Sequence, residues 1–407
     1  MADPAAAASP AGATGQVLAL GVTQTIAWAS STYLPAILAG PIAAELGVPR
    51  STVFGAFSLS LVVMALVGPA TGRAIDQYGG RRVLLLSNIV LAAGLALLAA
   101  ASSVTLLMLA WCVLGAGMAL GLYDAAFATL VGLHGHQARG PITGITLIAG
   151  FASTVGWPLT TWLSAHYGWH ACCLAWAALH LLLALPINWL CIPRRAKTVQ
   201  AAPQAKADTV DNAAPAAAPQ SARRTFVLLA IFSAATAFVT SAMAAHLPGL
   251  LMATGVTAAV AVTAGALLGP AQVAARLAEF GIAHRLRIHP LFTARLATAL
   301  HPAGAALIAL LFGLPAGAFG FAVLHGAGNG MITIAKGTLP LALFGPAGYG
   351  MRTGLLSVAA RGMQAVAPFA FGLVLEFSGA AAALTLSAAL SLIALAALLG
   401  LRGSPQQ

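Results

Sequence analysis

A few ionisable side chains stand inside long apolar segments, where each one needs a reason to be present. Arg361 lies near the middle of the segment LLSVAARGMQAVAPF, and Gln364 follows about one helical turn later on the same helix face. A guanidinium can hold a carboxylate through two parallel hydrogen bonds. We therefore expect Arg361 and Gln364 to bind an anionic solute. An internal ion pair of Arg361 with Asp124 or Glu279 is the alternative.

Asp124, in GLYDAAFATL, is the acidic counterpart of this arrangement. A carboxylate that alternates between buried and wet surroundings can take up and release a proton. Asp124 is therefore a candidate for proton coupling, and a fixed salt bridge between helices is its alternative role.

Arg276 and Glu279 are one helical turn apart near the end of an apolar run. Their position suggests a role in gating, while a contact between Arg276 and the solute is the second interpretation. Two histidines within apolar runs, His246 and His325, could relay protons because histidine titrates near neutral pH. Glycines surround His325, and Asn329 offers a polar partner one turn on. A hydrogen-bonded packing role is the alternative for both histidines.

The first apolar run is unusually polar. Gln24 and Trp28 are four residues apart and share a helix face, and Tyr33 follows them. Together with Trp157 these side chains could line a solute cavity. Tight packing between helices explains the same residues equally well.

The composition identifies the medium in which these residues act. Of 407 residues, 60% are hydrophobic and 7% are charged, whereas soluble domains carry about 25% charged residues. A transmembrane helix needs about 20 mainly apolar residues. The chain is therefore predicted to be an all-α membrane protein, and its long apolar runs do not fit the alternating strands of a β-barrel.

Twelve such runs divide into two sets of six. They lie near 16–39, 52–72, 82–101, 104–131, 141–165, 169–191, 225–253, 257–281, 290–312, 315–338, 350–376 and 380–401. The sequence predicts a disordered tail at 1–14, a six-helix bundle at 15–192, a flexible linker rich in Ala and Pro at 193–224, a second bundle at 225–401 and a tail at 402–407.

Lys and Arg alternate strongly between the predicted loops, and apart from Arg50 they fall on one side. The positive-inside rule places that side, with both termini and the linker, in the cytoplasm. The same rule explains the net charge of +11 without a nucleic-acid partner. We expect a multi-pass protein of a bacterial-type inner membrane that acts as a monomer.

The two halves carry a short repeated pattern. Gly-Pro-Ala begins both the 68–70 and the 269–271 segments, and each is followed by Arg-x-x-acid, at Arg73 with Asp76 and at Arg276 with Glu279. Two matching bundles with a site between them would follow from such a repeat.

The segment GRAIDQYGGRR fills the pattern G-x-x-x-D-x-x-G-x-R-[RK], with the fixed positions Gly72, Asp76, Gly79, Arg81 and Arg82. Glycines allow a tight turn, and Asp76 can face a helix N-terminus and pair with a nearby Arg. The segment resembles the signature loop of the major facilitator superfamily. That resemblance implies a secondary transporter with two six-helix bundles that rock around a central site, with this loop acting as a gate.

A weaker resemblance points to the monocarboxylate and oxalate porters. It rests on Tyr33-x-Pro35, ELGVPRS, HYGWH and the basic residues of the eighth and eleventh runs. The glycine pattern of drug antiporters in the fifth run is only half present, since Trp157 separates Gly156 from Pro158.

The sequence therefore predicts a proton-coupled carrier of a small organic solute, which is anionic if Arg361 binds it. Export of drugs, metabolites or metalloids by proton antiport is the alternative, and a membrane sensor that moves nothing is a third possibility. No P-loop, H-E-x-x-H or metal-spaced cysteine pair occurs, so we expect neither an enzyme nor a cofactor or metal site. The expected partners are a small-molecule substrate, protons and the lipid bilayer.

Overall fold

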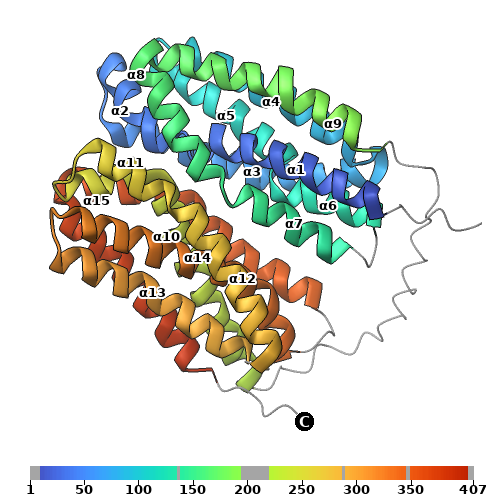
Figure 1. Ribbon diagram of the computed structural model, residues 1–407, viewed down its shortest axis with the longest axis vertical. Coiled ribbons are helices and arrows are strands. Elements are labelled where there is room, and N and C mark those ends of the chain that lie inside the picture. The colour runs from blue at the N-terminus through green and yellow to red at the C-terminus, as the bar shows by residue number, and fades with distance from the viewer. Residues whose placement is uncertain (1–9, 135–137, 194–219, 287–288, 345–348, 402–407) are drawn as a thin grey trace, which may run out of the picture.

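The computed structural model describes residues 10–134, 138–193, 220–286, 289–344 and 349–401. Every regular element in these ranges is a helix, and the helices form two bundles that lie side by side (Figure 1). The first half contains α1 (Pro10–Ser30), α2 (Pro35–Leu46), α3 (Arg50–Tyr78), α4 (Gly80–Ala99), α5 (Val104–Gly121), α6 (Tyr123–His134), α7 (Arg139–Ala149), α8 (Ala152–Leu179), the π-helix η2 (His180–Ala184) and α9 (Leu185–Cys191).

The second half contains α10 (Gln220–Ala253), α11 (Ala258–Ala266), α12 (Leu268–Leu286), α13 (Pro290–Leu310), α14 (Pro315–Phe344) and α15 (Tyr349–Leu399). Helix α10 begins before the predicted end of the linker, and α1 begins inside the predicted N-terminal tail. The remaining linker residues 194–219 and the predicted tail at 402–407 lie outside the described ranges.

Ten helical segments of the described chain are long and apolar enough to cross a membrane. Two of them contain a reversal. Gly168 and Gly379 both have a φ of 80°, a conformation that favours glycine. The chain turns back on itself after Gly168. A hydrogen bond of 3.1 Å from Trp176 Nε1 to Thr160 Oγ1 shows this, because a straight helix would hold the two residues about 24 Å apart.

The second reversal has the same effect in α15. Leu356 and Leu398 would lie about 60 Å apart in one straight helix, at 1.5 Å per residue. Both belong to a single buried hydrophobic cluster, so the helix folds back at Gly379. The ten segments therefore make twelve crossings within the described residues.

The turns define the two ends of the molecule. Gly47, Gly168, Gly255, Gly313 and Gly379, all with positive φ, lie in turns at one end, which we call the short-turn end. The Gly79 turn lies at the opposite end, which we call the signature-loop end.

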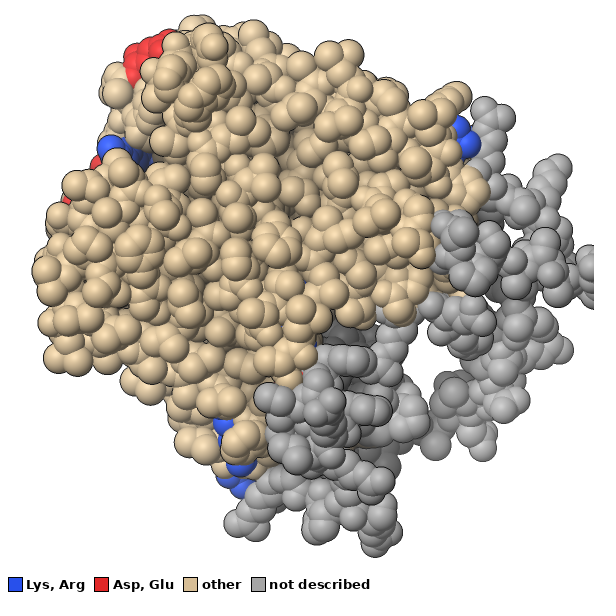
Figure 2. Space-filling model, in the orientation of Figure 1, with Lys and Arg blue, Asp and Glu red and all other residues tan. Residues whose placement is uncertain are grey.

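The surface fits the hydrocarbon layer. Large apolar side chains are exposed on many helices, for example Leu66, Leu182, Leu190 and Leu310, each at least 75% exposed. On the face shown in Figure 2, charged side chains gather near the helix ends and leave a wide uncharged middle. Such a surface suits lipid rather than water.

The orientation of the protein in the membrane stays a prediction. We expect alkaline phosphatase to be active when fused after Ser102 and inactive when fused after Gly79 or after Leu401, because the excess Lys and Arg retain the latter sites in the cytoplasm. Enzyme activity in intact cells is the measurement. Equal activity at Ser102 and Gly79, or activity after Leu401, would contradict the assigned topology.

Candidate functional site

A cavity of about 700 Å³ lies between the two halves. Its walls come from α1, α3, α5 and α6 in the first half and from α15 in the second. The lining residues include Trp28, Met64, Gly68, Thr71, Gly72, Ile75, Met118, Tyr123, Asp124, Ser357, Arg361 and Gln364. On α3 and α6 they run from mid-helix toward the signature-loop end, so the cavity is reached from that end.

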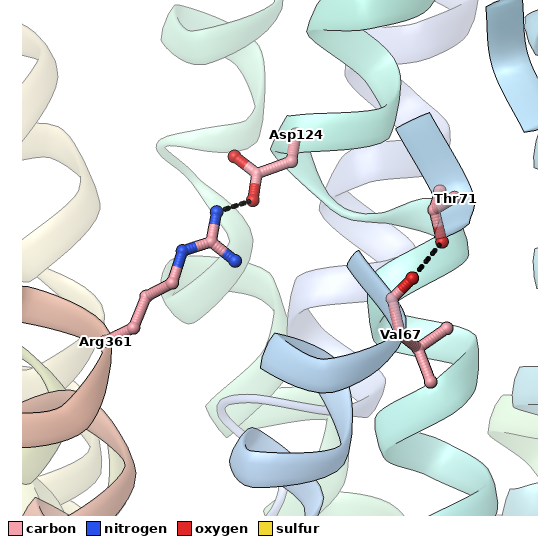
Figure 3. Close-up of polar contacts among 4 residues, drawn as sticks. All are labelled: Val67, Thr71, Asp124 and Arg361. Atoms are coloured by element: carbon pink, nitrogen blue, oxygen red, sulfur yellow. Dashed lines mark hydrogen bonds and ion pairs between the residues drawn. The ribbon is translucent and has the colours of Figure 1, made fainter. Parts of the chain in front are cut away.

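One ion pair crosses the cavity from half to half. Arg361 Nη2 on α15 lies 2.7 Å from Asp124 Oδ2 on α6 (Figure 3). The two side chains are 37% and 75% exposed, so this pair is open to solvent and to an entering solute. Thr71 also lines the cavity, but its hydroxyl donates to the Val67 carbonyl of its own helix at 3.3 Å.

A break in the fourth crossing presents Asp124 to the cavity. Leu122, between α5 and α6, has an extended backbone, and the N–H of Ala125 bonds to Leu122 O. The Gly121 carbonyl thereby loses its usual i+4 partner, and Gln24 Nε2 donates to it at 2.5 Å. Asp124 then falls in the first turn of α6, where the positive end of the helix dipole stabilises a carboxylate.

The predicted polar set of the first crossing divides between two roles. Trp28 lines the cavity, and its ring contacts that of Tyr123 with centroids 4.9 Å apart. Gln24 does not line the cavity; it is buried against Gly121. Tyr33 and Trp157 also lie outside the lining, and their rings meet edge to face at 5.4 Å. Trp157 is fully buried and donates to the Tyr33 carbonyl of its own half at 3.0 Å. It also belongs to a hydrophobic cluster built mainly from the second half, so it packs the two halves together.

The halves are in close contact on the short-turn side of the cavity. The Phe54 and His246 rings have centroids 3.7 Å apart, and the Glu376 carboxylate accepts a hydrogen bond of 3.1 Å from the Ser51 backbone N–H. Ser51 is in the first turn of α3, where an acidic partner is favourable. These contacts bring α3 of the first half against α10 and α15 of the second.

A proline of α15 lies at this contact, and one of the hydrogen bonds beside it joins the two halves. Pro368 has no N–H to offer the Gln364 carbonyl one turn earlier, and Ser241 Oγ donates to that carbonyl at 2.9 Å. The Pro368 carbonyl accepts from His246 Nε2 at 2.7 Å, and the Phe369 N–H donates to Ser58 Oγ of α3 at 3.1 Å. His246 therefore binds backbone at the contact between the halves and does not reach the cavity.

The neighbouring Glu279 suggests an ion pair for Arg276, but the structure surrounds Arg276 with neutral groups. Its buried guanidinium donates to neutral acceptors: Thr146 O at 3.0 Å, Gly330 O at 3.3 Å, and Gln272 Oε1 and Thr333 Oγ1 at 3.5 Å. Within the described residues no ion pair joins Arg276 to Glu279. Because Thr146 belongs to α7, Arg276 connects α12 of the second half to the first half.

His325 and Asn329 face the interior of the second half and not the central cavity. His325 Nδ1 lies 2.7 Å from His301 Nδ1, and Asn329 Oδ1 accepts from Thr240 Oγ1 at 2.9 Å. The sequence suggests both positions for solute binding, and the structure places them behind the wall that the solute would meet.

The signature loop joins α3 to α4. Gly79 ends α3 with a φ of 82°, and Gly72 lines the cavity. Arg81 lies over the Trp189 ring at 4.7 Å from its centroid, a cation–π contact that ties the loop to α9. Asp76 and Arg82 are exposed. Gly72 therefore borders the cavity, whereas Asp76, Gly79, Arg81 and Arg82 lie outside its lining, and gating by this loop stays a prediction.

The sequence-based predictions above do not include two further buried histidines. His301 is one, and His180 is the other, with Ser30 Oγ at 2.8 Å and Asn88 Oδ1 at 2.9 Å from its ring nitrogens. Both lie inside predicted apolar runs, so the criterion that selected His246 and His325 could have found them.

The fold and sequence now define the class of protein. The sequence pattern described as Major Facilitator Superfamily matches residues 20–321, and the chain belongs to this family of secondary transporters. No curated protein sequence matches the chain.

Solved structures with the same fold are distant in sequence. A bacterial homolog of the human lysosomal transporter Spinster, inward-facing and unoccupied, is 17% identical with a TM-score of 0.65, and the alignment covers 96% of this chain and 95% of that one. A point mutant of the nucleoside transporter NupG is 13% identical with a TM-score of 0.73, and 94% of this chain and 98% of that one are covered.

The capping role of Gln24 predicts a stability effect. Gln24→Leu leaves the buried Gly121 carbonyl without a donor, which should lower the free energy of unfolding by about 1–3 kcal/mol. Gln364→Leu is the matched control, because the Gln364 side chain faces the cavity. Thermal unfolding in detergent is the measurement, and equal effects of the two substitutions would remove the capping role.

The contacts at the short-turn end predict one-sided access. In a chain whose four cysteines are replaced, Gly68→Cys should react with a membrane-impermeant maleimide from the signature-loop side and not from the short-turn side. Adding Glu376→Gln weakens the contact with Ser51 and should increase labelling from the short-turn side. Labelling of the single variant that is equal from both sides would show that these contacts do not close the cavity.

Proposed function

We propose that this transporter moves an organic monoanion together with a proton, by exchange at the Arg361–Asp124 pair. The observation that carries the proposal is the placement of these two charges. Each half contributes one of them, and they meet, accessible to solvent, in a cavity between the halves.

Charge balance gives the order of events. A solute carboxylate that binds Arg361 displaces Asp124, and the released carboxylate then takes up a proton. The cavity gains one negative and one positive charge and stays neutral, so it can close without burying net charge, which costs at least about 2.5–3.5 kcal/mol at the bilayer centre. The empty cavity is neutral as well, because Arg361 returns to Asp124. Both the loaded and the empty carrier can therefore reorient.

The cavity also restricts the size, charge and polarity of the solute. Its volume is within the range of about 300–1,000 Å³ found for small-molecule sites. Among the described residues of its lining Arg361 is the single cation, and most of the wall is apolar, with the Trp28 and Tyr123 rings on one side. A monoanion with an apolar or aromatic body fits better than a compact dianion. The resemblance to monocarboxylate porters agrees with this, and the basic residues of the eleventh run on which it partly rests include Arg361.

Proton-driven export of apolar drugs or metabolites is the second candidate, and the apolar wall is the observation that favours it. An exporter of this kind would use Asp124 for proton exchange without needing an anionic solute. Location in a bacterial inner membrane is part of the proposal, which does not specify import or export.

Matched probes test the substrate class. We expect aromatic and alkyl monocarboxylates, such as benzoate and octanoate, to raise the melting temperature of the purified chain, while their amides do not. Arg361→Ala should weaken binding by about 10–100-fold, since a hydrogen bond to a charged group contributes about 1.5–3 kcal/mol. Amides that stabilise the protein equally would favour the exporter.

Transport of a probe then tests coupling. A sulfonate such as 2-naphthalenesulfonate is used, because it does not cross lipid as a neutral acid. In proteoliposomes Asp124→Asn should retain counterflow but lose accumulation driven by a pH gradient. Gradient-driven accumulation by this variant would contradict the exchange, and absence of counterflow by the wild type for every bound probe would favour a sensor.

A further inference from the structure

The interior of the second half holds a pair of histidines that the central cavity does not use. His301 on α13 and His325 on α14 are 3% and 4% exposed. Their Nδ1 atoms are 2.7 Å apart, and their rings are nearly perpendicular, at 74°. Phe321 packs beside both rings. The two imidazoles are thus held in contact by the surrounding helices.

The distance fixes the number of protons that the pair can hold. Two ring nitrogens at 2.7 Å must share one hydrogen, so one ring donates and the other accepts. In the tautomer in which His301 donates, its Nε2 carries a free lone pair. A proton added there makes the Nδ1–H···Nδ1 bond charge-assisted and stronger. A second added proton would set two N–H groups against each other and break the contact.

The surroundings leave one ring nitrogen unpartnered and a small polar space beside it. His301 Nε2 is buried and has no hydrogen-bond partner within the described chain. Next to the pair is a cavity of about 10 Å³, close to the space that one water molecule needs. Hydroxyl and amide groups of Thr236, Thr240, Asn329 and Ser391 line it. The two histidines are the titratable side chains among the described residues of that lining, so no other charge there competes for the proton.

A line of polar side chains runs along α14 from the pair toward the contact between the halves. His325, Asn329 and Thr333 follow one another at intervals of four residues on α14. Thr333 Oγ1 donates to Asn329 O at 2.9 Å and lies 3.5 Å from Arg276, whose guanidinium bonds to Thr146 of the first half. Arg276 on α12 is the charged group that this line reaches.

From this geometry we infer that His301 and His325 form a one-proton binding site inside the second half, separate from the Arg361–Asp124 pair. The existence of the site does not depend on the proposed exchange at Arg361, whereas its use in coupling rests on that function.

Nitrogen NMR of the full chain tests the site directly. The protein is labelled with ¹⁵N-histidine, placed in lipid nanodiscs and titrated from about pH 8 to about pH 5, the range in which histidine commonly changes charge. We expect the two rings to change from a pair of opposite neutral tautomers to an imidazolium–imidazole pair, with one proton bound. The loss of signals in His301→Gln and in His325→Gln assigns the rings. If a variant does not fold, the ¹⁵N–¹⁵N coupling across the shared hydrogen identifies the pair in the wild type.

Two controls make the result decisive. His180 is equally buried, but Ser30 and Asn88 occupy both of its nitrogens, so it should stay neutral over the same range. Asp124→Asn should leave the titration of the pair unchanged, which separates this site from the proposed exchange. The inference is overturned if both rings stay neutral throughout, if the pair binds two protons, or if it titrates together with His180.

Discussion

Polar groups inside a bilayer have to find their partners within the protein, because the hydrocarbon offers none and each unpaired backbone group costs several kcal/mol. This constraint explains why polar side chains from other helices surround the break at Leu122 and the proline of α15. At Leu122 the freed Gly121 carbonyl binds Gln24. At Pro368 the freed Gln364 carbonyl binds Ser241, while the neighbouring Pro368 carbonyl and Phe369 N–H bond to His246 and Ser58. Several polar residues of the membrane core thus serve to make irregular backbone possible, and the irregular backbone shapes the site.

The same constraint divides the charged residues of the membrane region into two kinds. Arg361 and Asp124 neutralise each other, yet they stay accessible, so an incoming ion can replace either one. Arg276 is surrounded by carbonyl, amide and hydroxyl oxygens that a solute cannot easily displace. An exposed pair suits exchange, whereas a fully bonded cation suits a structural contact between the halves. The difference lies in exposure and in the type of acceptor, and not in the identity of the residue.

The sequence predicts the crossings well because the signal is long. About 20 consecutive apolar residues leave little freedom, and the twelve predicted runs correspond to the observed crossings to within a few residues at most ends. Arg361, Asp124, Trp28 and Gln364 are also predictable as unusual residues, since polar groups within apolar runs are costly, and all four line the cavity. The sequence does not predict whether a polar residue lines the cavity or packs between helices. Gln24 and Trp28 share a helix face, but only the break at Leu122, which no strong local signal marks, turns one of them away from the cavity.

A single sequence also does not predict which side chains of distant crossings contact each other. Asp124 could have met Arg361 or stood alone, and the contact between His301 and His325 cannot be inferred from either position. The division of the cavity's charges between the halves also has a consequence for biogenesis. Asp124 leaves the ribosome 237 residues before Arg361, so the first half enters the membrane with an acid that lacks its base. Until the second half arrives, that carboxyl must stay hydrated or carry a proton, and the newly inserted first half should be the stage of assembly most sensitive to membrane quality control.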